Sequence, residues 1–398
     1  MTAYTRHDGR LLTSEAVTEG HPDKICDEIA DAIMSAVLRM NPHAHTGIEV
    51  AASYDKLLIF GEIGGITTQP DVVGIARSVL RDIGYTGASG LDPDTIPIEN
   101  HIAPQSVEID GGVTRASDGD DLDSIGAGDQ GMMIGYATDE TRERLPLPFV
   151  LAHRVSAALE DARHHDILPW LRPDGKTQVT IRYDGHGAHV DTVLVSTQHD
   201  GTVGLPDVIR GITDMVINPV LCESGIEHDG VRLLVNPCGE WHIGGPVSDS
   251  GLTGRKLGVD KYGGLALDGG GALCGKDPSK VDRSGAYAAR WIARAIVDAG
   301  LAHHASVQIA YAISIPEPVS INVDTGGTVI AGFTDEAIAD AVVRVFDLRP
   351  AAITRDLDLT NPDVYTGIKA RGHFGRDGFT WERDDDKVRE LKHALGVA

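Results

Sequence analysis

One order of predicted elements, a helix, a pair of strands and a second helix, occurs three times along the chain. The first unit predicts a helix over 22–40, strands within 47–65 and a helix over 70–85. Within the first helix, apolar residues such as Ile25 and Ile29 recur at a spacing of four, which places them on one helix face. An order repeated in this way favours three related domains over one continuous parallel sheet.

The second and third units follow the same order. Apolar periodicity predicts helices over 148–163, 206–221, 282–300 and 334–348, and strands over 177–199, 307–314 and 319–325. The 398 residues also exceed what one ordinary core accommodates. We therefore predict an α+β fold of three similar domains, each a sheet with helices on one face, in a pseudo-threefold repeat. The predicted boundaries are 1–109, 124–242 and 243–398.

The stretch between the first two units, residues 102–131, is dominated by glycine, aspartate and serine. A long segment with few apolar residues inside a compact protein is usually a lid or a disordered linker. Composition alone does not decide between the two. We assign residues 110–123 to part of a mobile active-site lid as a prediction.

Composition narrows the choice of partners and compartment. The chain has 59 acidic and 35 basic residues, a net charge of −24, which disfavours binding to nucleic acid or to anionic membranes. No apolar run reaches the 18–20 residues of a membrane-spanning helix, and the first residues lack the apolar run of a secretory signal. Four widely spaced cysteines without a CxxC pair fit a reducing compartment. We expect a cytoplasmic protein.

The sequence GHPDK, residues 20–24, is the first candidate site. Pro22 stands where a helix would begin, which leaves free N–H groups and the positive end of the helix dipole beside His21, Asp23 and Lys24. An anion bound there would accept a hydrogen bond from His21, with Asp23 holding a cation. The alternative is an ordinary helix start, in which Asp23 only complements the dipole.

A second candidate site combines basic residues with many glycines. Arg255, Lys256, Lys276 and Lys280 lie in two glycine-rich segments, where the backbone can approach a phosphate closely. Lys280 and Arg283 fall near a predicted helix start, where the dipole disfavours cations. A bound polyanion would explain that placement, and a solvated basic loop is the alternative.

The segment GGALCGKD, which begins at Gly270, partly matches the phosphate loop GxxxxGK[ST]. The match fails at Asp277, which stands where a hydroxyl should bind magnesium, and no continuous buried strand precedes the segment. Phosphate binding remains the prediction. Asp23 and Asp282 would suit a hard divalent cation, which prefers one or two carboxylates together with phosphate oxygens.

The other candidates have simple structural alternatives. Asp129 in GAGDQG is of a type that more often caps a local turn than binds a ligand. Glu49 and Glu62 fall in predicted strands, where an outward carboxylate is common. Trp241 could stack on a base, although tryptophan more often packs in a core.

Several sequence strings together resemble one family. GHPDK, GAGDQG, WLRPDGKTQVT, STQH, GLTGRK, GGGALCGKDPSKVDRS and GHFGR are similar to motifs of S-adenosylmethionine synthetase (methionine adenosyltransferase), and they occur in the family's order from residue 20 to residue 375. The resemblance implies a transferase of S-adenosylmethionine biosynthesis and one-carbon metabolism. In this reaction the methionine sulfur attacks C5′ of ATP, and the released tripolyphosphate is hydrolysed to pyrophosphate and phosphate.

The resemblance also implies roles for individual residues. ATP would be bound by His21, Asp174, Gly175, Lys176, Glu240, Trp241, Asp249, Arg255, Lys256, Ala272 and Lys276. Methionine would be bound by Glu62, Gln105, Asp249 and Lys280. The implied catalytic residues are His21, Asp129, Lys176, Arg255 and Lys276. Two magnesium ions would be held by Asp23 and Asp282, and potassium by Glu49.

Family members are homodimers or homotetramers with sites at the subunit interface, and the resemblance implies the same here. The chain departs from the family at Trp241, where phenylalanine is common, and at Glu240, which replaces a basic residue. From the glycine and lysine residues alone, an ATP-dependent phosphotransferase or polyphosphatase and a nucleotide-sensing regulator remain alternatives.

Overall fold

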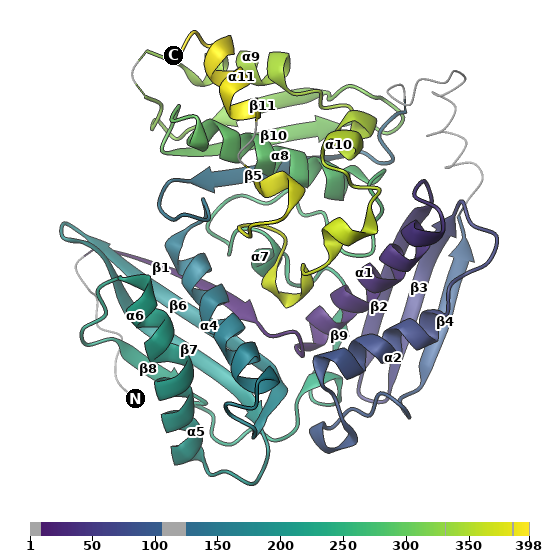
Figure 1. The fold of residues 1–398 in the computed structure, drawn as a ribbon, viewed down its shortest axis with the longest axis vertical. Coiled ribbons are helices and arrows are strands. Elements are labelled where there is room, and N and C mark those ends of the chain that lie inside the picture. Colours follow the sequence, from purple (N-terminus) through teal and green to yellow (C-terminus); the bar gives the residue numbers. More distant parts are fainter. Residues whose placement is uncertain (1–8, 106–124, 331, 384–385, 398) are drawn as a thin grey trace.

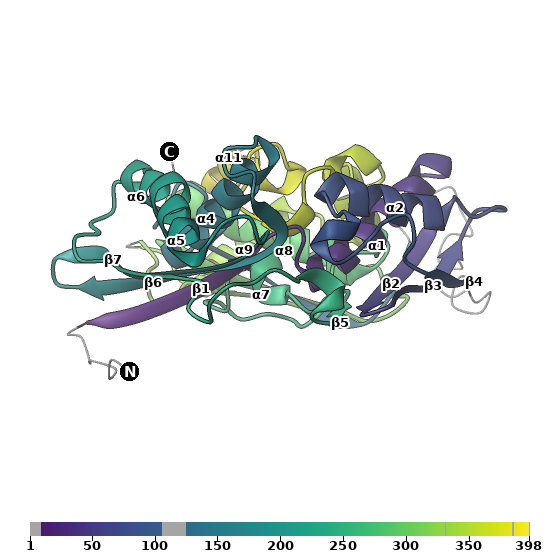
Figure 2. The ribbon, with the colours of Figure 1, turned by 90° about the horizontal axis from the view of Figure 1, so that it is seen from below.

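The computed structural model describes residues 9–105, 125–330, 332–383 and 386–397, and Figure 1 shows three lobes around a common centre. Each lobe is one sheet with helices packed on it. Figure 2 shows that the helices lie on one side of the molecule and the sheets on the other. The predicted α+β fold of three similar units is therefore confirmed. The predicted lid, residues 110–123, lies outside the described residues.

The first sheet has the strand order β4-β3-β2-β9. β2 (His45–Ser53) and β3 (Lys56–Gly64) form an antiparallel pair, and β4 (Ile98–Pro104) runs parallel to β3. The sheet is covered by α1 (Pro22–Met40), which has the predicted bounds, and by α2 (Val72–Ile83). The Asp71 side chain accepts a hydrogen bond from the Gly74 N–H at 2.9 Å, so α2 begins two residues after the predicted Pro70.

The second sheet has the order β1-β6-β7-β8. β6 (Leu171–Asp184) and β7 (Gly187–His199) form the predicted long hairpin, and β8 (Arg232–Val235) runs parallel to β7. α4 (Leu147–His164) packs on the sheet. The helix predicted over 206–221 is present as three consecutive segments: α5 (Leu205–Ile212), a π-helical turn (Thr213–Ile217) and α6 (Asn218–Ser224).

The third sheet has the order β11-β10-β5, with both pairs antiparallel. β10 (His304–Tyr311) is central and β11 (Ser320–Asp324) lies at one edge. Helices of the carboxyl-terminal part surround it, namely α8 (Val281–Asp298), α9 (Asp335–Val345), α10 (Pro350–Asp356) and α11 (Asp386–Ala394). The remaining short helices are α7 (Leu257–Asp260) and 3₁₀ turns at Gly87–Ser89, Gly245–Val247, Pro362–Tyr365, Lys369–Arg371 and Thr380–Glu382.

Each sheet also contains one strand from a distant part of the chain. β1 (Arg10–Val17) pairs with β6 in the second sheet, and β5 (Gly131–Thr138) pairs with β10 in the third. The short β9 (Gly251–Leu252) pairs with β2 in the first sheet. Figure 1 shows these exchanges as strands whose colour differs from that of their neighbours. The three lobes are therefore tied together by main-chain hydrogen bonds.

Three hydrophobic clusters correspond to the three sheets. Two buried ion pairs hold α8 against the rest of the molecule, Arg283 with Asp31 and Arg290 with Glu382. Among the described residues, no helix has the length and apolar character required to cross a membrane.

Candidate active site

The first turn of α1 presents a histidine whose outer nitrogen is unpaired. His21 is the N-cap residue, and its Nδ1 accepts a hydrogen bond from the Asp23 N–H at 3.1 Å. The imidazole therefore carries its proton on Nε2, which is buried and has no hydrogen-bond partner among the described residues. Burial, followed by the charges of Lys256 and Lys176, lowers the pKa of His21 to about 3. His21 is thus a neutral group that caps α1 and has an N–H to donate.

The backbone at this point is held from two sides. Tyr85 Oη donates a hydrogen bond to the Gly20 carbonyl at 2.5 Å. A Cβ on Gly20 would lie 2.4 Å from the Pro173 backbone, so only glycine fits there. These contacts place His21 beside the segment that leads into Lys176.

Asp23, the second residue of α1, is only 1% exposed and is surrounded by cationic side chains. Its Oδ2 accepts a hydrogen bond from Lys256 Nζ at 2.7 Å, and its Oδ1 lies 3.2 Å from Arg255 Nε. Burial opposes ionisation, but the hydrogen bonds from Lys256 and from the Leu252 N–H outweigh it, so the pKa of Asp23 is lowered. The predicted metal carboxylate and two predicted ATP residues thus lie in contact.

The predicted nucleotide residues of the middle lobe lie near one another. The buried carboxylate of Asp174 accepts a hydrogen bond from the Gly245 N–H at 2.7 Å, next to Gly175 and Lys176 in β6. Burial raises the pKa of Asp174 to about 7, and the charges of Lys176 and Asp249 act on the same group. Asp174 Oδ1 has no hydrogen-bond partner in the described part of the chain.

Trp241 and Glu240 occupy the nearby loop after β8. The Trp241 ring is partly exposed, and its Nε1 donates to the Ile243 carbonyl at 2.7 Å. The exposed Glu240 accepts from His242 Nε2 at 3.1 Å. Trp241 is therefore only partly buried and belongs to none of the three hydrophobic clusters.

A second group of predicted residues gathers at the start of α8 and on β2 and β3. Lys276 Nζ lies 2.5 Å from Asp282 Oδ2, and the Lys276 backbone forms a bridge with Gly47 of β2. Burial raises the pKa of the half-buried Glu49, which interacts with Lys276, Thr253 and then Glu62. Glu49, Glu62 and Lys276 therefore face a common space.

The other predicted residues of this part of the chain, Gln105, Lys280 and Asp129, have separate local contacts. Gln105 Oε1 is buried without a partner among the described residues, and it would lie 2.3 Å from a Cβ on Gly64. Lys280 Nζ lies 3.2 Å from Asp277 Oδ2. Asp129 is exposed and accepts a hydrogen bond from the Gln130 N–H, the local turn contact expected of its structural alternative.

The two groups of residues meet at one point. A Cβ on Gly254, the neighbour of Arg255, would lie 2.6 Å from the Cβ of Ala272. Asp23 and Asp282 belong to different groups, and each is paired with its own lysine. Among the described residues no three His, Cys, Asp or Glu side chains are arranged to hold a metal ion. The donor set still fits magnesium, which takes one or two carboxylates together with phosphate oxygens and water.

Two cations that the sequence analysis placed near an anion have structural roles instead. Lys24 is fully buried, with its Nζ 2.6 Å from Asp260 Oδ1 and 2.9 Å from Asp27 Oδ2. Arg283 is also fully buried, forms a two-pronged pair with Asp31, and lies 4.3 Å from the centre of the Tyr365 ring. The interpretation of Arg283 as a sign of a bound polyanion is therefore wrong.

The structure also adds positioning residues that the sequence analysis missed. Asp27 accepts from the Gly254 N–H at 2.9 Å and so holds the loop that carries Arg255 and Lys256. The buried Gln198 side chain accepts a hydrogen bond from the Asp174 N–H at 3.4 Å through Oε1. Its Nε2 donates to the His242 carbonyl at 3.0 Å. Gln198 lies within the STQH string, and this string is the one feature of the sequence that pointed to it.

An imidazole donor without a partner among the described residues, surrounded by lysines, an arginine and carboxylates, is the kind of site that suits a phosphate-containing ligand. Models of the N-terminal, central and C-terminal domains of S-adenosylmethionine synthetase match residues 9–107, 124–241 and 243–383. The chain belongs to the S-adenosylmethionine synthetase family.

Curated relatives give the same result over nearly the whole chain. It is 51% identical to S-adenosylmethionine synthase of Bifidobacterium adolescentis, covering 97% of this chain and 98% of the relative. It is 49% identical to S-adenosylmethionine synthase of Corynebacterium diphtheriae, covering 98% of each chain. It is also 49% identical to S-adenosylmethionine synthase 1 of Frankia casuarinae, covering 97% and 99%. The resemblance found in the sequence is confirmed, and with it the prediction of an S-adenosylmethionine-forming transferase.

Proposed function

We propose that the two groups of residues form one catalytic centre that joins ATP and L-methionine into S-adenosylmethionine. The activity follows from the family, and the roles of the residues are our proposal. The observation that carries it is the buried, unpaired Nε2–H of His21 beside Lys256 and Lys176. A fixed donor in a cationic pocket suits an oxygen that gains negative charge during the reaction.

The reaction needs positioning and charge stabilisation more than proton transfer. The thioether sulfur of methionine is a neutral nucleophile, which forms the S–C5′ bond while the C5′–O bond breaks. The electron pair of the broken bond goes to the leaving tripolyphosphate. His21 donates to the leaving oxygen, and Lys176, Arg255 and Lys276 offset the charge of the phosphates. Asp129 is assigned to the positive sulfonium that forms.

The substrates are assigned to opposite sides of the centre. The adenine is placed on Trp241, with Glu240 acting through its backbone. The rest of ATP is assigned to Asp174, Gly175, Lys176, Asp249, Lys256 and Ala272. Methionine is assigned to Glu62, Gln105, Asp249 and Lys280. Gln105 Oε1 is buried and has no hydrogen-bond partner within the described part of the chain, which supports this assignment, because such an amide oxygen is suited to accept from a substrate ammonium group.

The family implies a metal-dependent enzyme, and we propose magnesium at Asp23 and Asp282 and potassium at Glu49. Bound magnesium would add positive charge at the phosphates during the departure of the tripolyphosphate. Lys256 and Lys276, which now pair with the two aspartates, would then contact phosphate oxygens. Water next splits the tripolyphosphate into pyrophosphate and phosphate.

We further propose a homodimer or homotetramer in which each centre is completed by a second subunit. The exposed apolar side chains of Met132 on β5 and Leu252 on β9 support this. The four cysteines, all free, support a cytoplasmic location. The charge of −24 supports the absence of nucleic-acid and membrane partners.

One assay tests the function. The purified chain is given ATP and L-methionine with magnesium and potassium, and S-adenosylmethionine, pyrophosphate and phosphate are measured. We expect all three products, each dependent on methionine. Formation of ADP would instead indicate a phosphotransferase, and binding without turnover would indicate a sensor.

Subunit sharing has its own test in mixed subunits. Asp23→Asn and Asp282→Asn chains are unfolded together, refolded and assayed. If each centre takes Asp23 from one subunit and Asp282 from the other, the hybrids contain one intact centre, and the mixture recovers about a quarter of the wild-type activity. A mixture no more active than its parents would contradict shared centres.

A further inference from the structure

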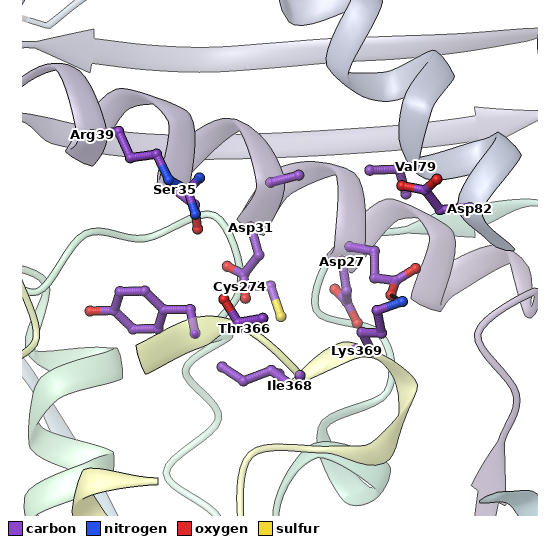
Figure 3. Close-up of a pocket in the computed structure, with 14 residues that line it drawn as sticks. Asp27, Asp31, Ser35, Arg39, Val79, Asp82, Cys274, Thr366, Ile368 and Lys369 are labelled. Carbon is purple, nitrogen blue, oxygen red and sulfur yellow. Dashed lines mark ion pairs between the residues drawn. The ribbon is translucent and has the colours of Figure 1, made fainter. Parts of the chain in front are cut away.

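A cavity of about 390 Å³ lies on the helical side of the molecule, between α1, α2 and the segment 365–369. Figure 3 shows Asp27, Asp31, Ser35 and Arg39 along α1. Val79 and Asp82 approach from α2, and Thr366, Ile368 and Lys369 from the other side. None of the residues assigned to ATP, methionine or metal lines this cavity.

Three carboxylates of α1 line the cavity, and only that of Glu28 has an ion pair too long for a hydrogen bond, with Lys369 at 3.8 Å. Asp27 pairs with Lys24 Nζ at 2.9 Å, and Asp31 pairs with Arg283 at 2.7 Å. The Glu28 side chain is 9% exposed, and its Oε2 has no hydrogen-bond partner among the described residues. Its Oε1 lies 3.8 Å from Lys369 Nζ, beyond hydrogen-bond distance.

The charged groups around Glu28 do not replace the missing partner. Lys369 is shared, because its Nζ is also 3.8 Å from Glu19 Oε2. Burial raises the pKa of Glu28 to about 8; Lys369 counteracts this, whereas the charges of Glu19 and Glu160 add to it. The more distant Lys24, on the same helix, has a smaller lowering effect. The ionised form of such a buried carboxyl group is stabilised when a cation that donates a hydrogen bond binds beside it.

The chemistry of the lining narrows the kind of cation. Within the described ranges no three acidic, histidine or cysteine side chains converge to hold a metal ion. The walls beside the acids include Val79 and Ile368, which suit a short alkyl chain. The enclosed volume fits a small molecule, since ligand sites commonly span about 300–1,000 Å³.

We propose that this cavity binds a small organic cation whose ammonium group donates a hydrogen bond to Glu28 and whose alkyl part contacts Val79 and Ile368. Asp82 on α2 adds negative charge at the opposite wall. Lys369 competes with the ligand for Glu28, so its ammonium group weakens binding. The site is separate from the reaction and does not depend on the roles proposed for the catalytic residues.

The test measures binding of n-butylammonium to the whole protein by calorimetry at pH 8 and constant ionic strength. We expect one site per chain and at least tenfold weaker binding of 1-butanol, which has the same length without the charge. Glu28→Gln keeps the shape and removes the charge, so it should weaken n-butylammonium binding about tenfold or more. Glu223→Gln, an exposed carboxylate on α6, is the matched control and should bind as the wild type does.

Circular dichroism checks that Glu28→Gln is folded. If it is not folded, a second variant still tests the proposal. Lys369→Gln removes the competing ammonium and should tighten binding. Wild-type affinity should also rise between pH 6 and pH 8, by at most about tenfold per pH unit, as Glu28 becomes ionised. The proposal would be overturned if n-butylammonium did not bind to the wild type or if its affinity were unchanged in both variants. It would also be overturned if potassium competed for the site as well as n-butylammonium does.

Discussion

The first turns of α1 and α8 are built alike, although they lie about 260 residues apart in sequence. In each helix the second residue is an aspartate paired with a lysine of a glycine-rich loop, Asp23 with Lys256 at 2.7 Å and Asp282 with Lys276 at 2.5 Å. In each helix the third residue is a buried cation, Lys24 or Arg283. Two of the three related units thus supply the same arrangement to the proposed active site.

The corresponding helix of the middle unit differs. α4 begins with Leu147, Pro148 and Phe149, all buried and apolar. That unit contributes its site residues from the start of β6 instead, at Asp174 and Lys176. A repeated fold therefore does not require a repeated site, because a helix start can serve either the core or a ligand.

The two similar turns differ at the cap. His21 caps α1, and its outer N–H has no partner in the described ranges, whereas Lys280 precedes α8 and pairs with Asp277 at 3.2 Å. The α1 turn is thus equipped with a neutral donor and the α8 turn with a cation. We assign the first to the leaving oxygen and the second to methionine.

The largest effect is expected at the third position of these turns. Arg283→Met removes the charged partner of the largely buried Asp31, which keeps only the hydrogen bond from the Gly275 N–H, so the free energy of unfolding should fall by about 3 kcal/mol. Denaturant titration measures it. Arg142→Met breaks an exposed pair with Asp377 and serves as the control, with little change expected. If the two variants were equally stable, Arg283 would not hold α8 in place.

Substitution at the second position should lower turnover more than it lowers stability. Asp23→Asn and Asp282→Asn should each lower turnover about a hundredfold at low magnesium, because each removes a carboxylate assigned to the metal. Part of the rate should return as the magnesium concentration is raised. Asp363→Asn, which changes an exposed carboxylate paired with Arg39, is the control. Normal activity at low magnesium in either variant would remove that residue from the metal site.

A smaller effect is expected at the cap of α8. Lys280→Gln should raise the KM for methionine about tenfold and change kcat less, since one charged hydrogen bond to substrate is lost. Asp277 keeps its bonds from the N–H groups of Thr46 and Ser279, so the loop should remain in place. A rise in the KM for ATP with no change for methionine would reassign Lys280.

The smallest effect concerns Glu240, where the chain departs from its family. Its carboxylate is exposed and contacts His242, so Glu240→Gln should change the KM for ATP less than about twofold. A larger change would mean that the side chain itself contacts the nucleotide.

Local features of this fold were predictable from the sequence, but partners distant in the chain were not. The four-residue spacing of Ile25 and Ile29 gave the bounds of α1 correctly, because one helix face packs on one sheet. The pairing of β1 with β6 could not be predicted from either strand. Alternation of apolar and polar residues shows which face of a strand is buried, but it does not show which strand lies beside it.

The same limit applies to the site. GHPDK marked His21 and Asp23 through the chemistry of a helix start. Lys24 and Arg283 looked equally suited to an anion. Lys24 pairs with the nearby Asp27, but its second partner, Asp260, and the Asp31 partner of Arg283 are more than 200 residues away. Charge type could therefore be read from the sequence, but burial could not.

The most direct measurement concerns His21 and compares two rates on one variant. In His21→Asn the new side chain can still cap α1 and accept from the Asp23 N–H, so the fold should persist, as circular dichroism would verify. S-adenosylmethionine formation breaks the C5′–O bond at the oxygen assigned to His21, whereas hydrolysis of added tripolyphosphate breaks a P–O–P linkage. We expect synthesis to fall about a hundredfold, the usual cost of one lost donor to developing charge, and hydrolysis to change far less. An equal fall in both rates would make His21 a general polyphosphate ligand and contradict its role at the leaving oxygen.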